Sequence, residues 1–219
     1  MMIQYAVFKT SLIIMALVTI VSSSILASDY PREKSFFVMD GSCCGGEETD
    51  PHAVHGIETE TGAFVLSGKM IDQTGMEDGF IIKISGSLPD EKIFLHEEEE
   101  FNFDWFVKLG NVNKRDGINA AASSEGSIFA VGYMQSQRGF IEGYLVKLDE
   151  RSGDIIWDRF FSSNKKNSEG AIESIIRTSD NGILVAGVRN SEKGTLEGFK
   201  SYGNPVSGNA YVMYFSENQ

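Results

Sequence analysis

The stretch Ile-Leu-Val-Ala-Gly at residues 183–187 decides the fold, because two similar stretches precede it in the chain. They read Phe-Val-Leu-Ser-Gly at residues 64–68 and Ile-Phe-Ala-Val-Gly at residues 128–132. Each is a short apolar run, rich in β-branched and aromatic residues and closed by glycine, which is typical of a buried strand. Recurrence at a period of roughly 50 to 65 residues predicts a repeat architecture.

Two further strands accompany each glycine-ended strand. The one that follows it carries a Tyr/Phe-Leu-Val-Lys type of pattern, at residues 78–84, 142–148 and, after a longer interval, 209–215. The one that precedes it is the least regular, at about 53–59, 117–123 and 171–178. Turn-forming sequences such as Thr-Ser-Asp-Asn-Gly at residues 178–182 separate the strands, and Gly153 is expected to supply a positive φ. The sequence therefore predicts antiparallel strands joined by tight turns.

An aromatic strand completes each copy. Residues 105–109 and 157–161 both begin with Trp, and Phe-Phe-Val-Met at residues 36–39 occupies the third such place. Taking the aromatic strand as the first of each copy, we predict three four-stranded antiparallel meanders within residues 35–216. Their expected limits are about 35–84, 103–148 and 155–216.

Length and composition agree with an all-β domain. The chain has 219 residues, of which 42% are hydrophobic and 11% aromatic, so one domain can bury a substantial core. Gly 23 against Pro 4, together with many Phe, Tyr, Val and Ile residues, favours short strands joined by tight turns.

The N-terminus predicts export. The first 27 residues hold no acidic group and one base, Lys9, and they include an apolar run that ends in small residues at Ala27. This pattern is typical of a secretory signal peptide over residues 1–27, and it predicts a secreted or periplasmic protein. An uncleaved N-terminal membrane anchor is the alternative, because the run approaches the minimum length of a membrane span.

The strong negative charge restricts the partners. The net charge is −12, and it becomes −13 when Lys9 leaves with the first 27 residues. Such a surface repels nucleic acid and anionic lipid, so we expect neither nucleic-acid binding nor membrane binding after cleavage. Cationic partners or divalent cations remain possible, and solubility alone also explains the charge.

The repeated residues resemble a known class of proteins. The glycine-ended strands, the Gly-Tyr-Leu-Val-Lys-Leu-Asp stretch at 143–149 and the Ser-Gly-Asp-Ile-Ile-Trp stretch at 152–157 are similar to the repeats of secreted microbial and quinoprotein-like β-propellers. The resemblance covers about residues 35–216 and implies a β-propeller-like fold. Propellers have four to eight blades, so three copies imply a partial propeller, an open stack or self-association that closes the ring.

One segment collects the potential metal and redox ligands. Cys43 and Cys44 are adjacent, and in an exported chain they form a vicinal disulfide, bridge to another chain or stay as free thiols. His52 and His55 follow closely, and the four residues could bind a divalent metal such as zinc or copper. In a regular strand, alternation would place the two histidines on opposite faces and oppose joint coordination.

Catalytic signatures are not evident in the sequence. There is no Gly-x-Ser-x-Gly elbow, His-Glu-x-x-His motif or phosphate loop, so we make no catalytic assignment and an enzyme is less expected than a binding protein. Trp105 and Trp157 recur at the same place in the repeat, which favours core packing over a sugar-stacking platform. The acidic run at residues 97–100, with His96 beside it, is expected to be a solvated loop.

These observations predict a secreted, non-enzymatic repeat scaffold that binds a protein or a glycan and needs no cofactor. Two alternatives stay open. One is a metal-binding or redox protein that uses the segment from Cys43 to His55. The other is a fragment of a larger propeller enzyme.

Overall fold

The computed structural model describes residues 36–38, 51–71, 74–85, 92–94, 103–111, 113–162, 168–192 and 208–216. These ranges contain thirteen β-strands and no α-helix, so the predicted all-β class is confirmed. Accordingly, the described chain offers no helical segment that could cross a membrane. The expected signal peptide and the residues Cys43, Cys44 and His96 lie outside the described ranges.

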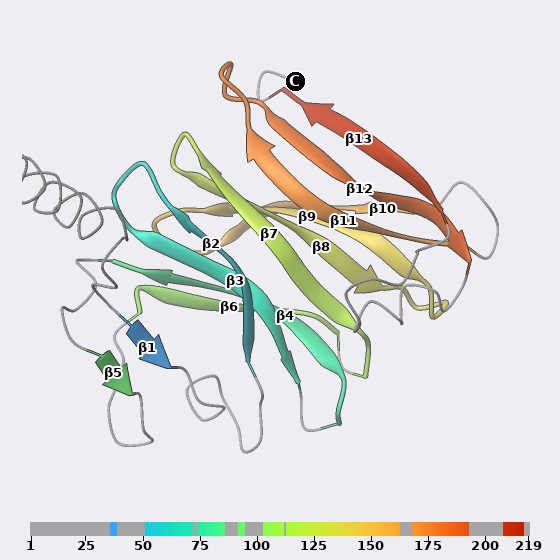
Figure 1. Ribbon diagram of the computed structural model, residues 1–219, viewed down its shortest axis with the longest axis horizontal. Helices are drawn as coiled ribbons and strands as arrows, with labels where there is room; N and C mark the ends of the chain where they lie inside the picture. Colours follow the sequence, from blue (N-terminus) through green and yellow to red (C-terminus); the bar gives the residue numbers. More distant parts are fainter. Residues whose placement is uncertain are drawn as a thin grey trace, which may run out of the picture. The chain divides into compact units, whose positions relative to one another are not determined.

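Eleven of the strands form three antiparallel meanders within one compact unit of the chain, residues 37–87 and 93–219 (Figure 1). The first sheet contains β2 (His52–Glu58), β3 (Phe64–Ile71), β4 (Glu77–Ile84) and β6 (Trp105–Leu109). The second contains β7 (Asp116–Ser124), β8 (Ser127–Gln135), β9 (Ile141–Asp149) and β10 (Ile155–Phe161). The third contains β11 (Ser168–Arg177), β12 (Ile183–Glu192) and β13 (Asn209–Phe215). The short strands β1 (Phe36–Val38) and β5 (Lys92–Phe94) pair with each other.

In the first and second sheets the aromatic strand is the last strand, and our expectation that it begins the meander is wrong. Trp105 lies opposite Lys83 of β4, and Trp157 lies opposite Lys147 of β9. The short turn between β9 and β10 is the physical reason, since Gly153 has a φ of 76° and its N–H donates to the Asp149 carbonyl. The sheets therefore span 52–109, 116–161 and 168–215, and the third has three described strands.

The three sheets pack face to face in sequence order, with the second in the middle. Between the first and second sheets lies a core that includes Val65, Ile81, Ile128 and Val146. Between the second and third sheets, a separate core buries Phe129, Val131, Leu145, Ile172 and Val185. Alternation along each strand sends successive side chains into these two cores, so both faces of the second sheet are buried. This open stack matches the propeller-like arrangement of meanders that the sequence predicts.

The repeated glycine has a specific structural role. A Cβ at Gly68, Gly132 or Gly187 would lie 2.0, 1.9 or 2.1 Å from a backbone carbonyl oxygen of the preceding strand. At each place that strand has a register shift, so one residue of β2, β7 and β11 bulges out of the ladder. The bulged residues are Val54, Asn119 and Glu173. The glycine admits the close approach of backbones, and the bulge redirects the first strand of every sheet.

Replacing Gly132 by alanine should destabilise the protein by about 2 kcal/mol or more, because the new methyl group meets a fixed backbone oxygen. Gly56→Ala is the matched control, since a Cβ at that strand glycine meets only the flexible end of Leu66, at 3.0 Å. Urea unfolding of both variants measures the difference. Equal losses in the two variants would contradict the role assigned to the repeated glycine.

Candidate functional site

The first strands of the three sheets enclose a groove, with β7 lying between β2 and β11 (Figure 1). The cavity has a volume of about 510 Å³ and is lined by residues that follow the bulge in each first strand. Ala121, Ala122 and Ser123 of β7 form its floor. His55 and Ile57 on one side, and Ile175 and Ile176 on the other, form its walls. We call this cavity the first-strand groove.

Small floor residues and apolar walls give the first-strand groove its chemistry. Ile57 is half-buried, and Ile176 is 57% exposed, so the walls present apolar surface to water. At one end the Arg177 guanidinium pairs with the Glu60 carboxylate, which joins the β2–β3 turn to β11. Arg177 also donates to the Asn181 side-chain oxygen at 2.5 Å. The groove therefore combines isoleucine walls with polar lining residues such as His55 and Ser123, and it has an ion pair at one end.

Side chains connect the first strands where no backbone ladder does. The Ala121 N–H donates a hydrogen bond to Nδ1 of His55 across 3.3 Å. On the other side of β7, the Asn119 amide donates to the Ile172 carbonyl at 2.9 Å and to a Glu173 carboxylate oxygen at 3.3 Å. Two bulged residues thus hold β7 against β11, and His55 holds it against β2.

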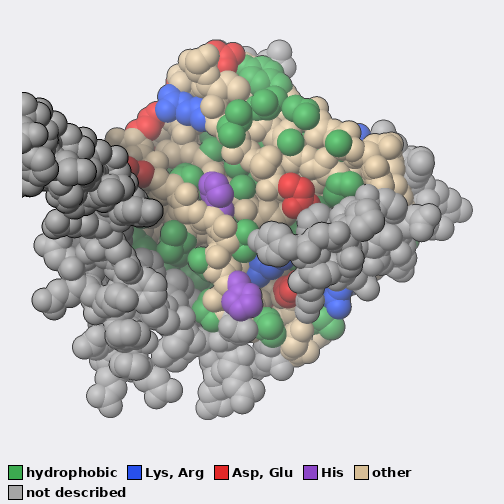
Figure 2. Space-filling view, viewed as in Figure 1, with side chains coloured by type: hydrophobic (Ala, Val, Ile, Leu, Met, Phe, Trp, Pro, Cys, Tyr) green, Lys and Arg blue, Asp and Glu red, His purple; other side chains and the backbone are tan. Residues whose placement is uncertain are grey.

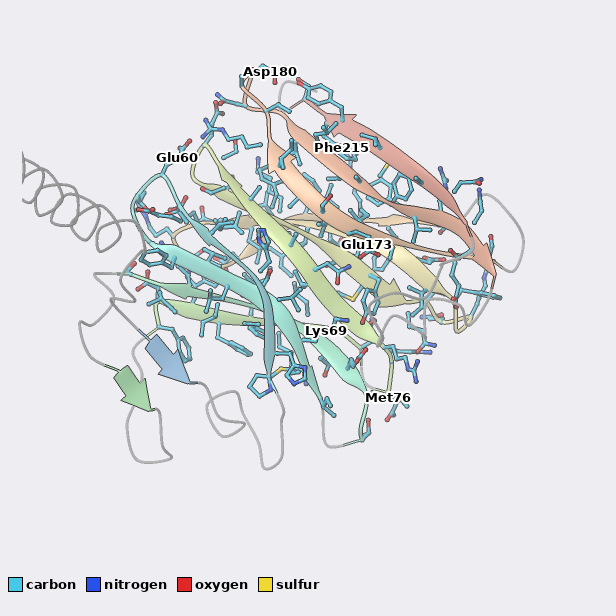
Figure 3. The ribbon with its side chains drawn as sticks, viewed as in Figure 1. Glu60, Lys69, Met76, Glu173, Asp180 and Phe215 are labelled. Carbon is cyan, nitrogen blue, oxygen red and sulfur yellow. The ribbon has the colours of Figure 1, made fainter. Side chains whose placement is uncertain are left out.

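A polar cluster lies near the bulges, where Lys69 and Glu173 are labelled in Figure 3. The Lys69 ammonium lies 5.1 Å from the centre of the Tyr133 ring, and the Tyr133 hydroxyl donates to Glu77 at 3.0 Å. Burial, reinforced by the Glu77 carboxylate, raises the pKa of Tyr133. Burial also raises the pKa of Glu173, which the nearby Lys69 charge partly opposes. These interactions order the surface beside the groove.

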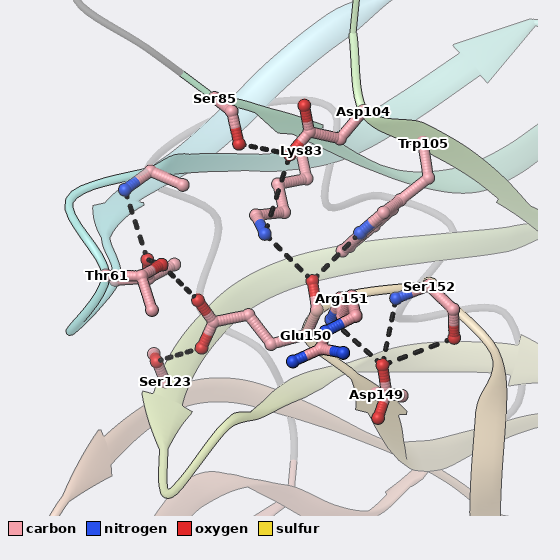
Figure 4. Close-up of polar contacts among 12 residues, drawn as sticks. Thr61, Lys83, Ser85, Asp104, Trp105, Ser123, Asp149, Glu150, Arg151 and Ser152 are labelled. Atoms are coloured by element: carbon pink, nitrogen blue, oxygen red, sulfur yellow. Dashed lines mark hydrogen bonds and ion pairs between the residues drawn. The ribbon is translucent and has the colours of Figure 1, made fainter.

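A separate group of hydrogen bonds and an ion pair connects the first sheet to the second (Figure 4). The carbonyl of Glu150 accepts hydrogen bonds from Lys83 Nζ and Trp105 Nε1, each at 3.0 Å. Its carboxylate accepts from the hydroxyl of Thr61 at 2.6 Å, and Lys83 also pairs with Asp104 at 3.5 Å. These residues bond to one another, so we assign them a structural role although several line a cavity of about 650 Å³.

Both tryptophans belong to the packing of the sheets, as predicted. Trp105 is buried in the core between the first and second sheets, and its ring lies against Gly153. Trp157 is half-buried and makes an edge contact with Phe129, with ring centroids 6.1 Å apart. Neither residue lines the first-strand groove.

The bulge changes the predicted placement of the two histidines. His52 lies opposite Lys69 and His55 opposite Ser67, and these two β3 residues are separated by one position. His52 and His55 therefore share a face, and our expectation from regular alternation is wrong. Across the described ranges, His, Cys, Asp and Glu side chains nowhere gather in threes that could hold a metal ion. Cys43 and Cys44 and the acidic run at 97–100 fall outside those ranges.

No protein-family model matches the chain, and no curated protein matches it. The groove therefore has to be interpreted from its own residues. Sequence reasoning missed Asn119 and Glu173, because a bulge leaves no strong mark in the strand that contains it. The available signal was the glycine of the neighbouring strand, which recurs in all three copies.

A buried carboxylate fixes the beginning of β7. Asp116 is fully buried, and its two oxygens accept hydrogen bonds from the N–H groups of Asn111 at 2.6 Å and Gln135 at 2.7 Å. Burial raises the pKa of Asp116 to about 6, with a smaller contribution from the charge of Asp78. Asp78 is itself paired with Lys108 at 2.6 Å. Ionisation of Asp116 is thus less favourable in the folded chain than in the unfolded chain.

We predict that Asp116 makes the protein less stable as the pH rises from about 4 to above 6. Its folded pKa lies above the ordinary value of 3.8, so its contribution is complete below pH 4 and is lost through pH 6. The free energy of unfolding of the wild type, relative to Asp116→Asn, should fall by up to about 3 kcal/mol over this range. Urea titrations at a series of pH values measure it. A difference that stays constant with pH would exclude this ionisation.

Proposed function

We propose that this protein is a secreted, non-enzymatic binding module that presents the first-strand groove to a protein ligand. One observation carries the proposal: each of the three repeats contributes the segment that follows its bulge to the same cavity. The scaffold is repeated, whereas the side chains at these places differ from copy to copy. A repeated framework with varied side chains at one shared surface suits ligand recognition.

The lining favours a protein ligand over a glycan. The groove has isoleucine in both walls and a floor of alanine and serine, and its lining includes no Trp, Tyr or Phe side chain on which a sugar could stack. Trp105, the strongest candidate for such a ring, is buried in the core. A groove of about 510 Å³ can hold an apolar side chain of a partner, as binding hot spots commonly do.

Charge at the rim indicates what surrounds that apolar side chain. Glu58 is exposed at the groove, Glu60 is paired with Arg177, and the whole chain has a net charge of −12. Basic residues in the ligand would be attracted by this field and would accelerate association at low salt. The proposed ligand is a protein segment with an apolar residue next to lysine or arginine.

Selection from a displayed peptide library on the immobilised protein tests this function. We expect enrichment of peptides that combine an apolar and a basic residue. Glu58→Lys should weaken their binding roughly tenfold or more, because it reverses a rim charge and leaves the apolar walls unchanged. Asp154→Lys is the control, since it makes the same charge change at an exposed position outside the groove.

Three results would overturn the proposal. Equal weakening by both substitutions would show a general charge effect rather than a groove. Binding to a glycan array, without peptide enrichment, would assign the ligand to the other class. Failure to enrich any peptide and to bind any glycan would remove the groove as a recognition site.

A further inference from the structure

One face of the third sheet has the same arrangement of side chains as the face of the second sheet that packs against the third. Cross-strand neighbours form two rows on this face, and in the second sheet the rows are Ala122, Phe129, Lys147 and Ala120, Val131, Leu145. The corresponding rows in the third sheet are Ile176, Leu184, Tyr214 and Ser174, Ala186, Val212, and Ile176, on the edge strand β11, also lines the first-strand groove. We call this surface the outer face of the third sheet. It is equivalent in position to a surface of the second sheet whose apolar residues are all buried.

Exposure separates the two equivalent surfaces. Leu145 is 0% and Phe129 is 3% exposed, because the third sheet covers them. On the outer face, which has no described strand above it, Val212 is the counterpart of Leu145 and is 64% exposed, Leu184 is the counterpart of Phe129 and is half-buried, and Tyr214 beside Leu184 is 48% exposed. Figure 2 shows hydrophobic side chains gathered over the third sheet. An apolar sheet face of this kind marks an interaction surface.

We propose that the outer face of the third sheet binds the same face of a second copy of this chain, forming a two-fold symmetric dimer. The contact continues the series of sheet-on-sheet interfaces that already joins the first sheet to the second and the second to the third. In a two-fold contact, a surface has to complement itself, and rows of Ile, Leu, Val and Tyr can interdigitate with an identical set.

The opposite end of the stack explains why the contact joins like faces. On the first sheet, the residues that point away from the second sheet include Met70, Phe80 and Ile82, and each is at most 1% exposed. That end is already covered, so it does not offer an apolar surface to the outer face of another copy. Two outer faces are left to meet each other.

Polar groups on the outer face fit such a contact. The Tyr214 hydroxyl donates to Asp180 at 2.6 Å within its own chain, so the ring can be covered without leaving this donor unpaired. Each copy has a net charge of −12, which repels a second copy at low ionic strength. Salt should therefore strengthen the dimer, whereas it would weaken a complex with a cationic partner.

Sedimentation velocity of the purified full chain over a concentration series tests the proposal. We expect a monomer–dimer equilibrium that shifts toward the dimer between about 0.05 and 0.5 M salt. Val212→Asp should weaken the dimer roughly a hundredfold or more, because the symmetric contact would bury two carboxylates. Ile156→Asp is the matched control, since Ile156 is 53% exposed on β10, outside the outer face, and its substitution should leave the dimer unchanged.

The alternatives give different results. A monomer at every concentration and salt would overturn the inference, as would a dimer that withstands Val212→Asp. A Val212→Asp effect matched by Ile156→Asp would assign the loss to general charge. Glu58→Lys, which tests the first-strand groove, should leave the dimer intact, so failure of the groove and failure of this interface remain distinguishable.

Discussion

The close approach of neighbouring backbones at Gly68, Gly132 and Gly187 is the contact on which the rest of the structure depends. Any side chain at these positions would have to occupy the same space as a carbonyl oxygen of the first strand. Because the glycine has no side chain to fill that space, the first strand can accommodate one extra residue and still pair with the second strand on both sides of it. The same local geometry is thereby imposed on three sheets.

The bulges determine what each first strand can present. Asn119 leaves the ladder and bonds to the carbonyl of Ile172, and Glu173 leaves the next ladder and meets Asn119. Because Val54 bulges out of the ladder, His55 lies on the same face as His52. From that face its imidazole accepts a hydrogen bond from the Ala121 N–H. Three strands that belong to different sheets are held side by side, and the groove lies over the segments that follow.

Between the first and second sheets, one group of buried polar side chains is hydrogen-bonded. Lys83 and Trp105 donate hydrogen bonds to the Glu150 carbonyl, Lys83 also pairs with Asp104, and the Glu150 carboxylate accepts a hydrogen bond from Thr61. Apolar rows fill the remaining interface. The third sheet repeats these rows without a described neighbour, and this difference leaves its outer face as the exposed end of the stack.

The all-β class, the glycine-ended strands and the structural use of Trp105 and Gly153 could be predicted from the sequence, because strand propensity, turn chemistry and repetition are properties of short segments. The assignment of the aromatic strand to the end of the first and second sheets could not, since pairing depends on which strands the connections bring alongside, as the tight turn after Asp149 does in the second sheet. The shared face of His52 and His55 required the bulge, which is decided by the adjacent strand. The sequence by itself determined three similar meanders. Only the tertiary structure decided that β7 lies between β2 and β11, because contacts between sheets join residues from separate copies and no local pattern encodes them.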